Sequence, residues 1–298
     1  MQQQVDFLIP APRFEAPPGQ LLKWIGNKQR FAAQIAEFFP ATFNSFYEPF
    51  LGSGAVIATV RPPHGFGSDV FLPLVQIFQT LVTDPQLVKD WYAARRNLID
   101  PDYGNKVAVY EQVKAAYNGQ ANAADLLFLS RTCYGGVVRF RKGDGYMSTP
   151  CGIHKPMPAV KFNLRVDAWH ARLSHCQFDH MDYRESIARA GQGDMIYCDP
   201  PYTHTQAIIY GAQDFRLQDL FVAIAEAKAR GARVALSIDG SKQSEAENLL
   251  PLPIPPGLFE RELLIDNGRC MLRRFQMEGE SLENFNVSDR LLLTYDPE

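Results

Sequence analysis

Apolar positions along the chain follow two spacings, one typical of helices and one typical of strands. Apolar residues recur at helical spacing from residue 31 to 39 and again from 217 to 224, which predicts amphipathic helices. Short, continuous apolar runs bounded by turn residues predict buried strands instead. The predicted strands are residues 43–47, a segment that ends near residue 69, and residues 176–178, 195–198 and 234–238.

Strands that alternate with helices predict an α/β fold, in which a mostly parallel, doubly wound sheet carries helices on both faces. One long stretch interrupts this alternation. Residues 84–135 have the pattern of helices, and residues 137–149 have the pattern of a β-hairpin with glycines in its loop. We therefore expect a discontinuous main domain, residues 1–83 and 163–298, with residues 84–162 inserted as a second domain.

Composition and charge exclude several classes of protein. The chain has 298 residues, of which 46% are hydrophobic and 21% charged, a balance typical of globular rather than disordered proteins. Its apolar runs are too short to span a bilayer, and its first residues lack the features of a signal peptide. Five cysteines are a sparse, odd set for a secreted disulfide framework. We expect a cytoplasmic protein without membrane association.

A glycine-bearing turn after the first predicted strand is one candidate ligand site. Gly52 and Gly54 let the backbone turn sharply and approach a ligand closely. Asp69 lies near the end of the next predicted strand, where an acidic side chain can accept hydrogen bonds from ribose hydroxyls. The third glycine of a dinucleotide fingerprint is absent, which disfavours NAD. Strand–helix packing and a capped turn are the alternative interpretations of these residues.

A second candidate site directly follows the apolar run 195–198. Asp199 and Pro200 stand at the carboxyl end of this predicted strand, where α/β sheets bind their ligands. Proline stiffens the backbone, so the Asp199 carboxylate and the Pro200 carbonyl form a rigid pair of acceptors beside the ring of Tyr202. Such a pair suits a flat ring with an exocyclic amine, whose two N–H groups meet the two acceptors. A surface turn is the alternative interpretation.

Four segments occur in a fixed order: Lys23-Trp24-Ile25-Gly26-Asn27-Lys28, Glu48-Pro49-Phe50-Leu51-Gly52-Ser53-Gly54, Asp182-Tyr183 and Asp199-Pro200-Pro201-Tyr202. In this order they resemble the DNA adenine methylase family, the alpha group of N6-adenine-specific DNA methyltransferases. The resemblance covers residues 21–295. Two positions depart from the family's pattern: Phe71 and Ser130 stand where the family often has asparagine.

The resemblance implies a Rossmann-like, S-adenosylmethionine-dependent methyltransferase fold. Residues 1–83 and 163–298 would form the catalytic methyltransferase domain. Residues 84–162 would form a target-recognition domain of helices and a β-hairpin that reads DNA.

The resemblance also implies S-adenosyl-L-methionine as the methyl donor, together with its binding residues. Trp24 and Lys28 would border the methionine end of the cofactor, and Asp69 would hold the ribose hydroxyls. Asp182 and Tyr183 would lie at its adenine. The full implied set is Trp24, Lys28, Pro49, Phe50, Gly52, Gly54, Asp69, Asp182, Tyr183 and Asp199.

The implied reaction transfers the methyl group to the N6 amine of an adenine flipped out of double-stranded DNA. Asp199, Pro200 and Tyr202 would be the catalytic residues. Hydrogen bonds from the amine to the Asp199 carboxylate and the Pro200 carbonyl would make its nitrogen more nucleophilic and stabilise the positive charge that develops there. Tyr202 would replace the stacking that the flipped base loses. The reaction requires no metal ion and no covalent enzyme intermediate.

The predicted hairpin lies in the most basic part of the chain. Residues 131–165 contain seven basic residues and one acidic residue, although the whole chain has a net charge of −3. A basic segment with interleaved aromatic residues is typical of DNA-binding surfaces. The candidate DNA-contacting residues are Arg131, Tyr134, Arg139, Arg141, Lys142 and Lys155. Arg139 or Arg141 suits guanine, whose edge matches a fork of donors. A solvated hairpin face is the alternative.

Other activities are consistent with parts of the pattern. An N4-cytosine methyltransferase uses the same acceptors, although Asp199 favours adenine; RNA or a protein amide would be other substrates. A non-catalytic DNA-binding protein on a methyltransferase fold is a further alternative, which the intact segments disfavour. Cys151 lies in the hairpin region and not after an apolar strand, which disfavours a C5-cytosine mechanism. Cys176 and His180 have no second ligand pair nearby, so no metal site is expected.

Double-stranded DNA is the expected partner. The enzyme would be bacterial, archaeal or phage-encoded. It would act as an orphan methylase or in a restriction–modification system, where a cognate restriction endonuclease would act separately.

Overall fold

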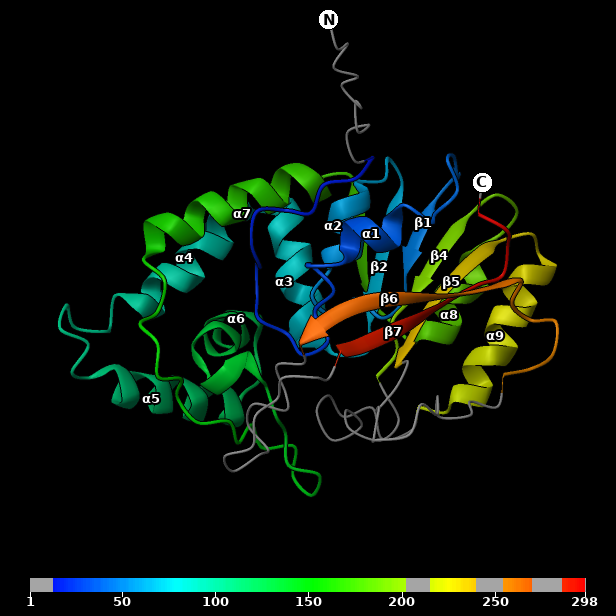
Figure 1. Cartoon of the computed structure of the whole chain (residues 1–298). Helices are drawn as coiled ribbons and strands as arrows, with labels where there is room; N and C mark the ends of the chain where they lie inside the picture. Colours follow the sequence, from blue (N-terminus) through cyan, green and yellow to red (C-terminus); the bar gives the residue numbers. More distant parts are fainter. Residues whose placement is uncertain (1–12, 202–214, 240–253, 270–285, 298) are drawn as a thin grey trace, which may run out of the picture.

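Seven strands form one mixed sheet in the described part of the chain, which covers residues 13–201, 215–239, 254–269 and 286–297 of a computed structural model (Figure 1). The strands are β1 (Phe46–Glu48), β2 (Gly65–Asp69), β3 (Cys176–His180), β4 (Met195–Cys198), β5 (Arg233–Asp239), β6 (Arg261–Arg269) and β7 (Asn286–Leu293). Their order in the sheet is β3-β2-β1-β4-β5-β7-β6. Strands β1 to β5 are parallel, whereas β7 is antiparallel to both of its neighbours. The predicted α/β fold is confirmed, and β6 and β7 add an antiparallel edge that the apolar pattern does not predict.

The order of the strands reverses between β1 and β4. From β1 the chain moves outward to β2 and β3, whereas β4 and β5 lie on the other side of β1. The loops that leave two such central strands diverge and open a crevice at their carboxyl ends. Strands β1 and β4 therefore define where a ligand site is expected.

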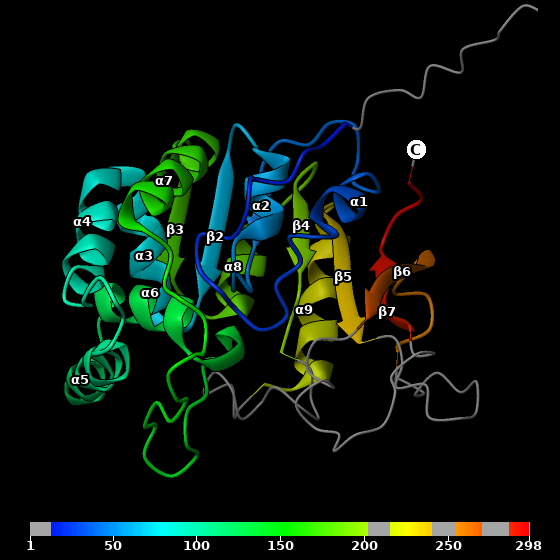
Figure 2. The same ribbon diagram turned by 60° about the vertical axis from the view of Figure 1, so that its left-hand side comes forward.

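Helices cover both faces of the sheet (Figures 1 and 2). Helices α1 (Ala32–Ala36), α2 (Ala55–Val60) and α3 (Leu72–Thr83) share one hydrophobic core with the sheet. Helices α8 (Tyr183–Arg189) and α9 (Leu217–Ala229) form a second core on the opposite face. No helix in the described ranges is both long and apolar enough to cross a lipid bilayer.

Strand β4 shows why a fully apolar run is recognisable as a central strand. Met195 and Tyr197 belong to the first core, whereas Ile196 and Cys198 belong to the second. All four side chains are buried, because neighbouring strands and helices enclose both faces. A strand that is covered on both faces of the sheet requires an apolar residue at every position, whereas a strand covered on one face requires one at alternate positions.

The inserted segment consists mainly of helices that lie to one side of the sheet (Figures 1 and 2). These are α4 (Pro85–Arg96), α5 (Lys106–Gly119) and α6 (Ala123–Thr132). Helix α7 (Ala159–Leu173) follows them and packs against α2, α3 and α4. The predicted domain boundary between residues 162 and 163 falls within α7.

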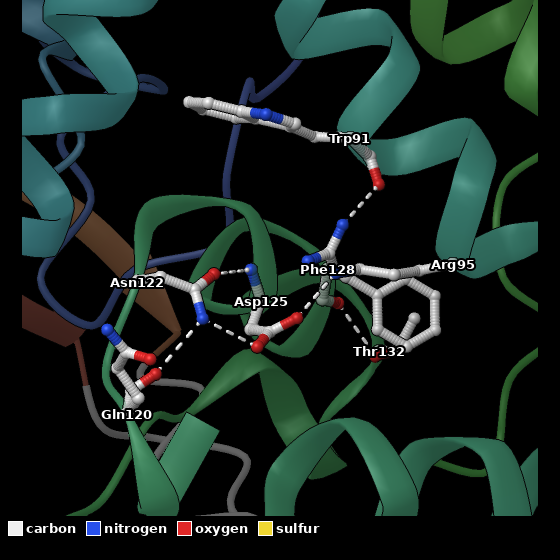
Figure 3. A network of polar contacts seen from close by, with 7 residues as sticks. All are labelled: Trp91, Arg95, Gln120, Asn122, Asp125, Phe128 and Thr132. Carbon is white, nitrogen blue, oxygen red and sulfur yellow. Dashed lines mark hydrogen bonds and ion pairs between the residues drawn. The ribbon is translucent and has the colours of Figure 1, made fainter. Parts of the chain in front are cut away.

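A buried polar network joins α4 to α6 (Figure 3). The Nε atom of Arg95 on α4 lies 2.6 Å from Oδ1 of Asp125 on α6. Asn122 caps α6, because its Oδ1 accepts the Asp125 N–H at 2.8 Å while its Nδ2 donates to Asp125 Oδ2 at 2.7 Å. Both oxygens of the buried carboxylate are therefore satisfied, and the two helices are held in one arrangement.

The segment predicted as a β-hairpin forms a paired loop rather than two regular strands. Phe140 and Met147 make an isolated antiparallel bridge. Arg141 N–H donates to the Tyr146 carbonyl, and Ser148 N–H donates to the Arg139 carbonyl, both at 2.9 Å. The loop projects beyond the carboxyl-terminal edge of the sheet in both views (Figures 1 and 2).

The helix predicted over residues 31–39 is shorter than expected. Helix α1 covers only Ala32–Ala36, and Phe31 precedes it without a side-chain cap. Asn27 closes a turn before this helix, in which its Oδ1 accepts the Gln29 N–H at 2.7 Å. Asn27 also lines the ligand crevice.

Candidate active site

A cavity of about 350 Å³ lies at the carboxyl ends of β1, β2 and β4. It is lined by residues from all four of the segments that carry the family resemblance. Its lining includes Trp24, Lys28, Pro49, Phe50, Gly52, Asp69, Asp182, Tyr183 and Asp199. These are nine of the ten predicted cofactor residues, and the fold brings them together from positions far apart in the sequence.

The two glycines of the turn have different surroundings. Gly52 lines the cavity with a φ of +47°, and a Cβ atom there would lie 3.4 Å from the Trp24 ring. Gly54 begins α2 with a φ of +63°, and a Cβ atom there would lie 2.8 Å from the Phe78 ring on α3. The structure thus places Gly52 at the cavity, whereas Gly54 allows close packing between the turn and α3.

The carboxylate of Asp69 is fixed by two backbone N–H groups. Its Oδ1 accepts the Phe71 N–H at 3.0 Å, and its Oδ2 accepts the Gly52 N–H at 3.3 Å. Burial raises the pKa of Asp69, and these backbone hydrogen bonds partly oppose the rise. Asp69 therefore links the end of β2 to the glycine turn while it lines the cavity.

Lys28 and Asp199 form an ion pair at the cavity, with 2.9 Å between Nζ and Oδ1. Their side chains are only 7% and 18% exposed, respectively. Lys28 comes from the first resembling segment, and Asp199 directly follows β4. The ammonium group therefore compensates the charge of the carboxylate and fixes the position of its Oδ1.

Aromatic rings form another wall of the cavity. Phe50 stacks on Tyr183, with ring centroids 5.0 Å apart and an interplanar angle of 25°. Phe215 meets both rings edge-on, at 5.9 and 5.7 Å. Asp182 caps α8 beside them, and a hydrogen bond from Arg184 lowers its pKa.

Sequence reasoning missed several residues of this cavity. Glu48 lines it and is buried, and its Oε2 accepts the Ile57 N–H at 2.7 Å. Burial raises the pKa of Glu48 well above its ordinary value, and the nearby Asp199 carboxylate raises it further. The only sequence signal for this role was its place at the start of the glycine-turn segment. Phe215 and Arg184 also line the cavity, and no motif pointed to them.

Asn27 is a further cavity residue to which the sequence analysis assigned no ligand. Its Nδ2 atom is buried and has no hydrogen-bond partner among the residues that the structure describes. A buried amide donor without a partner carries a free-energy cost that a ligand oxygen would remove. The first resembling segment pointed to this position but not to its chemistry.

The predicted catalytic residues are placed in part. Asp199 lines the cavity, as does Pro201, and Pro200 between them is buried. Tyr202 lies outside the described residues.

The predicted DNA-contacting residues separate into two groups. Arg139, Arg141, Lys142 and Lys155 are exposed, and so is Tyr134 at 41%. Arg131 is only 9% exposed, and its guanidinium donates to the carbonyls of Gln20 and Leu21 at 2.7 and 2.8 Å. Burial lowers the pKa of Arg131 to about 10. The structure thus places Arg131 inside the protein, where it anchors residues 20–21.

The cysteines considered as alternative chemistry are set apart from the cavity lining. Burial raises the pKa of Cys151, which opposes formation of a thiolate nucleophile. Cys176 is buried on β3, whereas a ring nitrogen of His180 lies 2.9 Å from the Val70 carbonyl. In the described ranges, no three His, Cys, Asp or Glu side chains are grouped so that they could hold a metal ion.

A family model described as D12 class N6 adenine-specific DNA methyltransferase matches residues 24–235. The match covers more than half of the chain. The chain belongs to this family. The resemblance predicted from the sequence is therefore confirmed, and so is the Rossmann-like methyltransferase fold. Membership in the D12 class implies S-adenosylmethionine as the methyl donor.

Individual relatives carry matching names. The chain is 28% identical over 245 residues to a DNA N-6-adenine-methyltransferase of Escherichia phage P1, covering 78% of this chain and 31% of that protein. It is 28% identical over 232 residues to a DNA adenine methylase of Vibrio cholerae, covering 72% of this chain and 79% of that protein. It is 24% identical over 247 residues to a type II methyltransferase of Lactococcus lactis subsp. cremoris, covering 75% and 82%.

The chain spans less than a third of the phage relative's length and most of the other two. Among solved structures, an rRNA methyltransferase from Streptomyces viridochromogenes covers 90% of this chain and 85% of its own. Its sequence identity to this chain is 14%, and its TM-score is 0.34.

Proposed function

We propose that the cavity binds S-adenosylmethionine, and that Asp199 and Pro200 bind the N6 amine of an adenine flipped out of double-stranded DNA beside it. The observation that carries this proposal is the Lys28–Asp199 ion pair. It joins two separate resembling segments at the wall of one cavity, next to the glycine turn. Burial of two charges carries a desolvation cost that their pairing offsets, and a buried charge pair at the wall of a cavity is typical of functional sites.

The residues of the cavity fit the cofactor. The unpartnered Nδ2 donor of Asn27 suits an acceptor oxygen of the ligand. Gly52 leaves open the space beside Trp24 that a larger side chain would fill. The Asp69 carboxylate suits ribose hydroxyls, and the rings of Phe50 and Tyr183 suit a flat purine. S-adenosylmethionine supplies an activated methyl group on a positively charged sulfonium.

Asp199 and Pro200 would act on the adenine amine. Its lone pair is shared with the ring, so the amine is a poor nucleophile. Acceptance of its two N–H groups by the Asp199 carboxylate and the Pro200 carbonyl favours a more tetrahedral nitrogen. The same acceptors stabilise the positive charge that grows on this nitrogen, and preorganised groups of this kind are worth about 3 kcal/mol each. Lys28 holds the carboxylate in place before the base arrives.

The basic loop around residues 139–146 would bind DNA. It projects beyond the carboxyl-terminal edge of the sheet (Figures 1 and 2), and the residues that line the cavity lie at the same edge. DNA bound by the loop could therefore deliver a flipped base to Asp199. Arg139 and Lys142 are exposed in it, whereas Arg141 pairs with Asp144 at 2.8 Å. Lys155 follows the loop in the sequence, and its Nζ lies 4.8 Å from the centroid of the Tyr103 ring. Residues 84–162 would thus be the target-recognition domain, with Arg131 inside it as an anchor and not as a DNA contact.

The enzyme would serve either as an orphan methylase or as the modification enzyme of a restriction–modification system. The Lactococcus relative is named as a type II methyltransferase, which supports the second role. A cognate endonuclease would then act as a separate protein on the same recognition sequence.

Transfer of a tritium-labelled methyl group to duplex DNA, followed by nucleoside analysis, tests this proposal. The expected product is N6-methyladenine, and sequencing of the methylated DNA identifies the recognition sequence. Recovery of N4-methylcytosine, or of no labelled nucleoside, would contradict the proposal.

Replacement of Asp199 tests the role of the acceptor. We expect Asp199→Ala to lower the methylation rate by roughly 100-fold or more, because one preorganised acceptor is lost. Affinity for S-adenosylhomocysteine should change by no more than about threefold. The matched control is Asp90→Ala, which removes an exposed carboxylate on α4 and should leave the rate unchanged. An Asp199→Ala enzyme that retains wild-type activity would exclude this mechanism.

A further inference from the structure

A row of aromatic rings connects the cavity wall to the basic loop. Trp24 lines the cavity, and its ring lies 6.1 Å from the ring of Phe71. Phe71 in turn meets Phe140 edge-on, with centroids 5.5 Å apart and an interplanar angle of 67°. Phe140 also contacts Tyr117 on α5 at 6.4 Å. The ligand site and the loop are therefore in contact through packed side chains.

The position of Phe71 is set by a residue of the cavity. Its N–H donates to Oδ1 of Asp69 at 3.0 Å, and it stands directly before α3. The other oxygen of Asp69 accepts the Gly52 N–H. One carboxylate therefore joins the glycine turn, the cavity and the residue that directly precedes α3. A ligand that orders Asp69 and Trp24 also orders Phe71 between them.

At the other end of the row, Phe140 sets the position of the basic side chains. Phe140 is half-buried and packs on the main core, whereas Arg139 and Arg141 on either side of it are exposed. The two arginines flank a ring that packs on the core, so a shift of Phe140 would shift both of them. The antiparallel bridge between Phe140 and Met147 links the two sides of the loop, so a shift of one side would shift the other.

We propose that Phe71 is a positioning residue that couples occupancy of the cofactor cavity to the placement of the basic loop on DNA. This inference rests on the proposed function, in which the loop around residues 139–146 binds DNA. The Phe71 ring is in contact with Trp24 on one side and with Phe140 on the other. An asparagine would be too small and too polar to fill the space between two aromatic rings.

The coupling is reciprocal, because it is a difference in binding free energy between two sites. Cofactor in the cavity raises the affinity for DNA, and DNA raises the affinity for cofactor by the same factor. We expect about a tenfold effect in the wild-type protein, within the range of measured couplings.

Binding measurements on Phe71 variants test the inference. S-adenosylhomocysteine is titrated into the protein with and without a DNA duplex that contains the enzyme's recognition sequence. In Phe71→Asn and Phe71→Leu, the roughly tenfold gain should fall to about twofold or less. Affinity for S-adenosylhomocysteine without DNA should stay within about threefold of wild type, because Phe71 is not part of the cavity lining.

Phe43→Leu is the matched control. Phe43 is a half-buried ring in contact with Phe46 at 5.9 Å, near the amino-terminal end of β1 and away from the row. This variant should retain the wild-type gain. Phe140→Leu probes the row from its other end, and the double variant with Phe71→Leu should lose no more coupling than either single variant.

Hydrogen exchange of the loop gives a second readout that involves no DNA. The Arg141 and Ser148 amides are hydrogen-bonded within the loop, so their exchange reports its opening. S-adenosylhomocysteine alone should slow their exchange in the wild type and in Phe43→Leu, but not in the Phe71 variants.

The outcomes separate the two proposals. A wild-type enzyme that methylates adenine but shows no coupling, or Phe71 variants that retain it, would overturn the inference and leave the function standing. A wild-type protein that neither binds nor methylates duplex DNA would overturn the function. If Phe71→Asn does not fold, Phe71→Leu and Phe140→Leu decide the same question.

Discussion

Glu48 and Asp199 stand at the carboxyl ends of the neighbouring strands β1 and β4. Their carboxyl groups are stabilised in different ways. Asp199 is paired with Lys28 at 2.9 Å, whereas Glu48 accepts a single backbone N–H and has a strongly raised pKa. A raised pKa favours the protonated form, which costs less to bury. The cavity thus holds one compensated carboxylate and one carboxyl group that resists ionisation.

Glu48→Gln should change the pH dependence of stability. The pKa of Glu48 is raised in the folded protein, so its contribution to stability is fully present below the ordinary pKa of 4.5 and is lost as the pH rises above it. The glutamine variant lacks this contribution. Urea unfolding between about pH 4 and pH 8 should therefore show a smaller fall in unfolding free energy with rising pH than the wild type. Glu185→Gln, at an exposed position on α8, should behave like the wild type; equal pH profiles for all three proteins would contradict this account.

Asn27→Ala should weaken cofactor binding. Loss of a hydrogen bond from its buried Nδ2 costs about 1 kcal/mol, or roughly a fivefold loss of affinity for S-adenosylhomocysteine. Asn27→Asp keeps the oxygen that accepts the Gln29 N–H and removes only the donor, so it should lose at least as much. Isothermal titration calorimetry measures both. The control is Asn44→Ala, which removes an exposed amide before the amino-terminal end of β1. Affinities of the Asn27 variants within twofold of wild type would argue against a ligand contact.

At the scale of elements, the basic loop is held by the helix beside it. Asn118 on α5 donates to the Met147 carbonyl at 3.2 Å and accepts the Met147 N–H at 2.7 Å. Tyr110, on the same helix, donates to the Thr149 carbonyl at 2.8 Å. The backbone of the loop is therefore anchored on one side, while its basic side chains point to solvent.

Two substitutions in this loop should affect DNA binding differently. Arg139→Ala removes a guanidinium group with several hydrogen-bond donors. It should reduce the difference in binding free energy between the recognition sequence and other DNA by about 1–3 kcal/mol. Lys142→Ala removes one charge at the loop's turn, so it should reduce the slope of binding against salt concentration by about 1. Competition binding at several salt concentrations distinguishes these effects. Arg261→Ala on β6, at the far edge of the sheet, should change neither quantity, and sequence-blind losses from both loop variants would exclude base reading by Arg139.

At the scale of the whole molecule, the inserted helices and the sheet share one continuous hydrophobic core. Phe128 and Phe162 from the insertion belong to the same cluster as Phe46 and Leu74 from the sheet and its helices. Arg131 adds to this connection by anchoring residues 20–21. Elements that share a core unfold together, so we expect one cooperative transition for the whole chain.

Phe128→Ala should therefore destabilise the entire protein and not only the insertion. Its fully buried ring leaves a cavity, at a cost of about 3–5 kcal/mol in unfolding free energy. Urea unfolding followed by circular dichroism and by S-adenosylhomocysteine binding should give the same shifted midpoint. Val222→Ala, exposed on α9, should change stability by about 0.5 kcal/mol or less. Two separate transitions would contradict a shared core.

The sequence alone was sufficient to predict the parallel strands of the sheet, and the family resemblance pointed to the segments that line the cavity. The apolar run 195–198 is readable because a central strand must be apolar on both faces, and residues near Gly52 and Asp199 cluster because parallel strands end at one edge. Such signals are local in the chain, so periodicity and composition carry them.

Only the tertiary structure decided the state and surroundings of individual side chains. The basic residue Arg131 became an anchor inside the protein, Glu48 acquired a raised pKa, and Phe71 came to lie between the cavity and the basic loop. Burial, desolvation and ring contacts depend on residues that are distant in the sequence and adjacent in space. No periodicity or local motif records these distances, so the sequence could not predict them.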